Sequence, residues 1–279
     1  MDTEVETKFE RMGARLKITV VPVSARLGND WRVSKAEDRK RPVTVDIRRD
    51  NKGEYFELRH RSNVSVQVLD VRSSDRHLLL MVRGPGQDRS KPVKSRFLCG
   101  HDERAWFVAA VPEHARASNV QGAKDALKPQ EVWAAIDTFG VAGTDRDRRR
   151  TDAFIRQGEW FFVPNARLKV SEQYVLHNEP IRRGSGKPHI CQFVYRTGGQ
   201  QVYVSSAYPN GLSVSQYQGL SQTERGSQRW RTMVRDARVY AKGAIRHRDH
   251  KTVWLDCWHL VVMNTETQAQ AMRHVAFLD

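Results

Sequence analysis

The chain has 279 residues, and its 47 Lys and Arg against 32 Asp and Glu give a formal net charge of +15 at neutral pH. Such an excess makes acidic polymers the expected partners, because Lys and Arg neutralise phosphates and release counterions. A hydrophobic fraction of 39% supplies material for ordinary cores and argues against an intrinsically disordered chain.

The apolar runs and the cysteines indicate a compartment. No apolar run has the length of a membrane-spanning helix, and the first residues alternate acidic and basic side chains where a signal peptide would be apolar. The three cysteines are an odd number and lie far apart, unlike a secreted disulfide framework. We therefore expect a cytoplasmic protein that is neither exported nor embedded in a membrane.

The first half of the chain has the pattern of a series of strands. Polar and apolar residues alternate over 63–68, as in a sheet with one wet face, whereas 78–82 is continuously apolar and predicts a strand buried on both faces. The polar segment 28–40 predicts an exposed loop. The expected strands are 15–23, 42–48, 54–59, 63–71, 76–83, 96–100 and 105–111.

Two short helices are expected near the middle. The spacing of Ser118 and Gln121 matches a capping box and predicts a helix start. Pro129 suits the first turn of a second helix, whose apolar stripe includes Val132 and Ile136 and which Gly140 should end.

The second half returns to strands at 159–163, 190–196, 201–205, 238–245 and 252–263, and Gly198-Gly199 predicts a hairpin turn. The whole pattern predicts a β-rich α+β protein with two sheet domains, each a partly closed barrel, joined by a short helical segment. The expected divisions are an N-terminal β-rich domain at 1–117, a helical connector at 118–145, a C-terminal β-rich domain with basic loops at 146–263, and a tail at 264–279.

Basic clusters fall in the predicted loops, where they can contact the phosphates of nucleic acid. The cluster at 182–187 is not a Walker loop, because Lys187 is followed by Pro188. We expect a nucleic-acid-binding protein, RNA being favoured over DNA, that belongs to a ribonucleoprotein or mobile-element system and has protein partners there. The expected contact residues are Arg146, Arg148, Arg149, Arg150, Arg182, Arg183, Lys187, Arg246, Arg248 and Lys251.

Histidines supply the alternative of an enzyme. His247 and His250 share a basic turn, and imidazoles of this kind exchange protons with a ribose hydroxyl or a leaving oxygen while nearby cations stabilise phosphate. A nuclease using His247, His250 and His259 is therefore the second hypothesis. A third is a structural subunit that binds an acidic protein partner.

Every cysteine has a histidine two positions away, which places both side chains on one face of a strand. Such pairs offer the ligands that zinc prefers, although the spacing differs from that of zinc fingers. We expect no cofactor apart from this zinc alternative, whose ligands would be Cys99, His101, His189, Cys191, Cys257 and His259.

Two short motifs carry a resemblance. Gln157-Gly158-Glu159 opens a strand, and His247 to His250 forms a His-x-x-His turn that runs into a later strand. The C-terminal half thereby resembles uncharacterised β-rich bacterial and phage proteins with a Gln-Gly-Asp strand motif and a terminal His-x-x-His turn. Glu159 replaces the Asp here, and a long insertion separates the motifs. The resemblance implies a compact β module and no particular activity.

Overall fold

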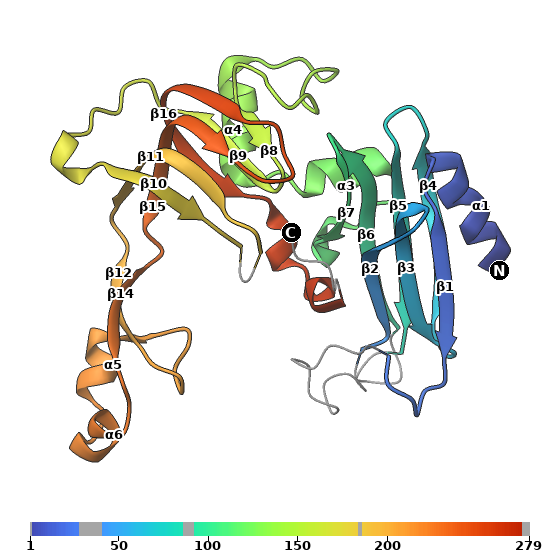
Figure 1. The fold of residues 1–279 in the computed structure, drawn as a ribbon, viewed down its shortest axis with the longest axis horizontal. Helices are drawn as coiled ribbons and strands as arrows, with labels where there is room; N and C mark the ends of the chain where they lie inside the picture. The colour runs from blue at the N-terminus through green and yellow to red at the C-terminus, as the bar shows by residue number, and fades with distance from the viewer. Residues whose placement is uncertain (1, 28–40, 86–91, 184–185, 275–279) are drawn as a thin grey trace.

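The computed structural model describes residues 2–27, 41–85, 92–183 and 186–274 (Figure 1). The predicted β-rich α+β class is confirmed: four separate sheets carry the fold and helices are few. In the described ranges none of the sheets closes into a barrel, so both halves are built from open sheets. Across the same ranges, no helix combines the length and the apolar character needed to cross a membrane. The expected loop at 28–40 lies outside the described residues.

Two sheets and one helix build the N-terminal half. One sheet has the order β1-β3-β2, with β1 parallel to β3, and the other is the antiparallel meander β4-β5-β6-β7. The elements are α1 (Asp2–Met12), β1 (Leu16–Val21), β2 (Val43–Asp50), β3 (Gly53–Arg61), β4 (Ser65–Arg72), β5 (His77–Gly84), β6 (Val93–Asp102) and β7 (Ala105–Val111).

The core of this half lies between the two sheets and α1. Phe9 of α1 packs edge-on against Phe56 of β3 with ring centroids 5.2 Å apart, and Phe56 contacts Trp106 of β7 in the same way. Leu78 and Leu80 of β5 enter this core, while Leu79 enters a second one on the other face. The prediction of a strand buried on both faces is confirmed.

The helical connector packs on that second face. α3 (Val120–Ala126) begins one residue later than the capping-box spacing predicts, because the side chain of Asn119 accepts the N–H of Gly122 at 2.7 Å. α4 (Gln130–Phe139) ends at Gly140 as predicted and packs against Phe154 and Phe161 of the C-terminal half. The short 3-10 turn η1 (Glu113–Ala115) precedes them.

The C-terminal half is a six-stranded sheet with the order β10-β11-β15-β16-β9-β8. Its pairings are all antiparallel, and one face buries a core that includes Phe162, Val194 and Ile245. The elements are β8 (Ile155–Gln157), β9 (Trp160–Pro164), η2 (Glu172–Tyr174), β10 (Leu176–Ile181), β11 (His189–Thr197), β15 (Arg238–Arg246) and β16 (Val253–Met263).

An arm, residues 198–238, projects from this sheet between β11 and β15 (Figure 1). The predicted hairpin at Gly198-Gly199 is wrong, because the strands on its two sides do not pair with each other. β11 pairs with β15 as far as Thr197 and Arg238, and beyond the glycines β12 pairs with β14. The arm contains β12 (Gln200–Val204), β13 (Leu212–Ser213), α5 (Val214–Gln218), α6 (Gln222–Gly226) and β14 (Arg231–Arg235).

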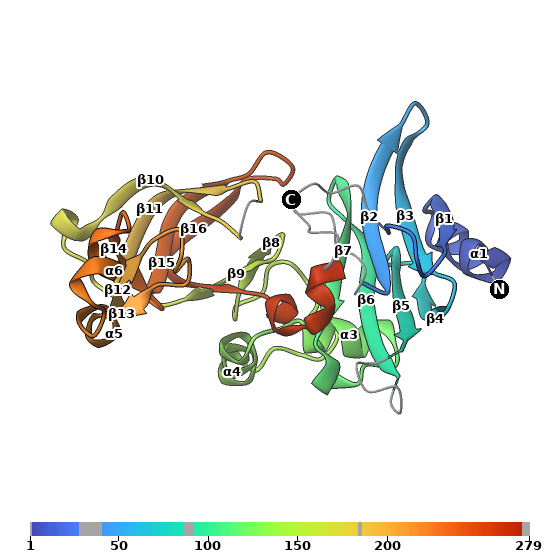
Figure 2. The ribbon, with the colours of Figure 1, turned by 90° about the horizontal axis from the view of Figure 1, so that it is seen from below.

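The segment after β16 returns to the N-terminal half as η3 (Thr265–Gln268) and η4 (Gln270–His274), beside β7 (Figure 2). Ala269 and Ala271 are buried in the first core, and the carboxylate of Glu113 accepts the N–H groups of Gln270 and Ala271. The described part of the expected tail is therefore docked.

Candidate metal centre

Three histidines from separate segments meet where the two halves join. His189 begins β11, His247 directly follows β15, and His250 lies in the turn before β16. Because Ile190 pairs with Arg246 across β11 and β15, the neighbouring His189 and His247 become adjacent. One nitrogen from each ring lies within 4.8 Å of the others, and the rings of His189 and His247 stack with centroids 4.1 Å apart.

Gln157 fixes the orientation of His189. Its amide nitrogen donates to the carbonyls of Ile245 and Lys251, at 3.2 and 2.7 Å, and its Oε1 lies 2.9 Å from His189 Nδ1. Since both amide hydrogens are engaged, the oxygen must accept the Nδ1–H of His189. The Nε2 of this fully buried ring is then free of a proton, which is the tautomer that a metal ligand needs.

The other two imidazoles have buried nitrogens without hydrogen-bond partners among the described residues: both nitrogens of His250 and Nε2 of His247. Burial, followed by repulsion from His189, lowers the pKa of each ring to about 4, so both are neutral at pH 7. His247 Nδ1 accepts the N–H of Asp249 at 3.2 Å, which places the ring's proton on Nε2. This ring would change tautomer or turn over on binding a metal.

Two carboxylates flank the cluster. Glu159 Oε2 lies 3.7 Å from His189 Nε2, and Glu103 Oε2, from the β6–β7 turn of the other half, lies 3.7 Å from His250 Nδ1. Burial raises the pKa of Glu159, but its contact with His189 and the charge of Arg183 lower it to about 2. The centre therefore has two acidic groups that favour a bound cation.

Gly158 gives the cluster its space. Its φ is +58°, a left-handed conformation, and a Cβ at this position would lie 2.8 Å from His250 Nε2. A side chain here would force His250 away from its neighbours. The Gln-Gly-Glu motif thus contributes an orienting amide, a gap and a carboxylate.

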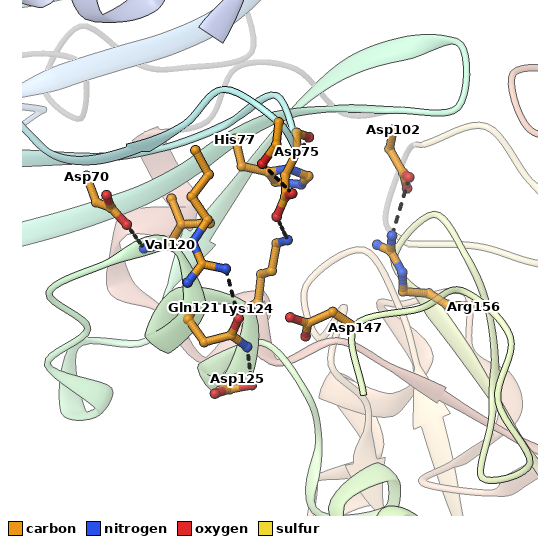
Figure 3. A network of polar contacts seen from close by, with 12 residues as sticks. Asp70, Asp75, His77, Asp102, Val120, Gln121, Lys124, Asp125, Asp147 and Arg156 are labelled. Carbon is orange, nitrogen blue, oxygen red and sulfur yellow. Dashed lines mark hydrogen bonds and ion pairs between the residues drawn. The ribbon is translucent and has the colours of Figure 1, made fainter. Parts of the chain in front are cut away.

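The centre opens through His250 and Glu159 into a cavity of about 150 Å³ lined by both halves. Its lining contains six Lys or Arg side chains, and each of them forms an ion pair with a carboxylate of the protein. Figure 3 shows part of this wall, where Lys124 reaches Asp75 at 2.9 Å and Arg156 reaches Asp102 at 3.3 Å.

Half of the ten cations predicted to contact phosphate instead form ion pairs within the protein. They are Arg146 with Asp125, Arg148 with Asp145, Arg149 with Asp102 and Glu103, Arg183 with Glu266, and Lys187 with Asp249.

The other five differ in their contacts. Arg150 donates to the carbonyl of Trp254 and Arg246 to Asn178. The side chains of Arg182, Arg248 and Lys251 are exposed and have no carboxylate partner in the described part of the chain, although the backbone N–H of Lys251 donates to Glu103. Phosphate binding by these loops stays a prediction.

The six predicted zinc ligands do not come together. Cys99 and Cys191 are buried in separate apolar cores, and burial raises the pKa of both thiols, that of Cys191 to about 12. Cys257 and His259 lie near Asp256, but the Nδ1 of His259 donates to the Cys257 carbonyl. Of the predicted ligands, His189 alone belongs to the three-imidazole cluster.

The predicted nuclease histidines are assembled in part. His247 and His250 lie together, but the third histidine of the cluster is His189 and not the predicted His259. In the sequence, His189 follows a basic glycine-rich loop, which makes it a candidate site residue. No local pattern linked it to the turn that holds His247 and His250. No family model, curated protein or solved structure matches the chain.

Proposed function

We propose that this protein is a zinc-dependent hydrolase that cleaves phosphodiester bonds in nucleic acid, with the metal held by His189, His247 and His250. The observation that carries the proposal is the convergence of three imidazoles, two of which, His247 and His250, have buried nitrogens without hydrogen-bond partners among the described residues. A buried polar atom without a partner costs about 1–3 kcal/mol. Metal coordination would satisfy one such nitrogen on each of the two rings.

The donor set favours zinc over magnesium or calcium. Imidazole nitrogens suit zinc, whereas the harder ions prefer carboxylate and carbonyl oxygens. Three protein ligands leave a fourth position open, which is typical of catalytic rather than structural zinc. The orienting hydrogen bond from His189 to Gln157 is the kind of outer contact that holds a ligand in one tautomer.

The groups around the centre support hydrolysis as the proposed reaction. Bound zinc lowers the pKa of a water ligand toward 7 and polarises a phosphoryl oxygen. In the reaction the water oxygen bonds to phosphorus, the ester P–O bond breaks, and the leaving oxygen takes a proton from solvent. Glu159 is ionised and lines the cavity, so it is positioned to accept the proton that water releases. The Lys and Arg side chains of the cavity lining are the groups that would contact the phosphate of a phosphodiester substrate.

Metal analysis and turnover test the proposal together. Protein purified without chelator should contain close to one zinc per chain by mass spectrometry, and should hydrolyse bis(p-nitrophenyl) phosphate and a labelled oligonucleotide. His189→Ala and His250→Ala should lose both properties. His177→Ala, at an exposed position on β10, is the matched control and should retain them.

Two results would contradict the proposal. Absence of zinc after dialysis against a zinc buffer would exclude the metal centre. Stoichiometric zinc with no turnover of either substrate would leave a structural metal and exclude the hydrolase.

A further inference from the structure

The arm carries unpaired positive charge. It contains five arginines but only two carboxylates, those of Glu224 and Asp236. Glu224 is engaged in capping α6, where it accepts the backbone N–H and the hydroxyl of Ser221, and Asp236 lies 3.5 Å from Arg235. The remaining exposed arginines, with no carboxylate partner among the described residues, are Arg229, Arg231 and Arg238.

Aromatic rings hold the arm together. Tyr203 and Tyr217 stack with centroids 3.9 Å apart, and Trp230 lies edge-on to Tyr217 at 5.0 Å. These rings are only partly buried. Among the large apolar side chains described in the arm, Val202 is buried and the others are partly or fully exposed. Tyr203 covers one face of Tyr217, and Tyr208 stacks on one face of Trp230 with centroids 5.5 Å apart, so the remaining exposed part of each ring is accessible beside the free arginines.

One edge of the arm is also unprotected. β14 is an outer strand of the order β13-β12-β14, and all five of its residues are exposed. Met233 and Val234 there are 51% and 58% exposed, although proteins usually shield such edges. An exposed apolar edge of this kind is typical of an interaction surface.

We propose that the arm binds single-stranded nucleic acid. Arg229, Arg231 and Arg238 would contact phosphates, and Trp230 and Tyr217 would stack on bases. The pairing of free cations with aromatic faces favours an unpaired strand over a duplex, whose bases are stacked on each other, and over an acidic peptide, which offers no ring to stack.

The test uses charge reversal in the whole protein. The triple variant Arg229→Glu, Arg231→Glu and Arg238→Glu lowers the net charge by six. The control triple variant Arg49→Glu, Lys52→Glu and Arg83→Glu makes the same change at exposed positions of the N-terminal half. Fluorescence anisotropy with a labelled single-stranded 20-mer, as DNA and as RNA, would be measured across a range of salt concentrations.

The arm variant should bind at least tenfold more weakly than the control variant. Its dependence of log affinity on log salt should be shallower by about 2, since each lost phosphate contact on a single strand removes about 0.7. Equal binding by the two variants would overturn the proposal, and so would tighter binding of polyglutamate than of the 20-mer by the unmodified protein. Zinc content should stay unchanged, which keeps this result separate from that of the metal centre.

Discussion

Replacing Gly158 by alanine tests whether the backbone at the β8–β9 turn is shaped for the histidine cluster. The new Cβ would lie 2.8 Å from His250 Nε2, and an ordinary van der Waals contact begins at 3.4 Å. His250 would therefore have to move by about 0.6 Å. Loss of an outer contact to a ligand typically costs a metal site 10- to 100-fold in affinity, and we expect displacement of His250 to weaken zinc binding by roughly as much.

The same substitution has a cost in stability that can be separated into two parts. A non-glycine residue in the left-handed conformation costs about 1–2 kcal/mol, and overpacking adds about 1–3 kcal/mol. Gly140, with φ of +62° and no atom within 4 Å of the place that a Cβ would take, isolates the first part. Gly140→Ala should thus lose about 1–2 kcal/mol and Gly158→Ala about 2–5 kcal/mol.

Urea unfolding in the presence of chelator measures the two stabilities, and competition with a chromophoric chelator measures zinc affinity. Gly140→Ala should bind zinc as the unmodified protein does. The reasoning is refuted if Gly158→Ala also keeps that affinity and matches Gly140→Ala in stability, because the clash with His250 would then have no consequence.

Three further substitutions test the packing and the charges. Changing Lys128, which is almost fully buried between Asp125 and Asp147, to Met should cost about 3–5 kcal/mol in urea unfolding, because Asp147 loses its ion-pair partner and Asp125 keeps only Arg146. Phe56→Ala should cost about 3–5 kcal/mol by the same assay, since it opens a cavity in the N-terminal core. Burial, followed by repulsion from Lys124, lowers the pKa of His77 to about 4. The unfolded chain then binds the extra proton, so the contribution of His77 to stability is full above pH 6.5 and falls by up to about 3 kcal/mol toward pH 4; His77→Asn should remove this part of the decline and leave the part due to His247 and His250, whose pKa values are also lowered to about 4.

Local patterns predicted most strands because each strand has its own alternation or apolar run. The segment from Ala105 to Val111 was predicted with the bounds that the structure has. The sequence also held a signal for α1 that the prediction missed, since Val5, Phe9 and Met12 have helical spacing and all face the core. β10 escaped prediction because its residues are mostly exposed and include Pro180, which is tolerated at the sheet edge where β10 lies.

The candidate site depended on strand order, which local patterns do not carry. His247 and His250 were recognisable as a pair because one turn holds both. His189 joins them only because β11 lies beside β15, with the whole arm between them in sequence. Ion pairing could not be predicted for a related reason. In the sequence Arg149 has no evident partner, whereas in the structure it pairs with Asp102 and Glu103 at the β6–β7 turn.

The ladder of β11 and β15 connects the two proposed sites. One end holds His189 next to His247, and at the other end Thr197 pairs with Arg238 at the base of the arm. The eight steps between the nine residues of β11, at about 3.4 Å each, place the base of the arm about 27 Å from the metal centre.

A strand held by the arm would therefore reach the centre only if it were long enough to span that distance, and tethering would then raise its local concentration there. The arm variant should accordingly raise KM severalfold for a 20-mer while leaving kcat unchanged. Its turnover of bis(p-nitrophenyl) phosphate, which is too small to touch both sites, should equal that of the unmodified protein. An equal loss on both substrates would mean that the arm acts by supporting the sheet rather than by holding the strand.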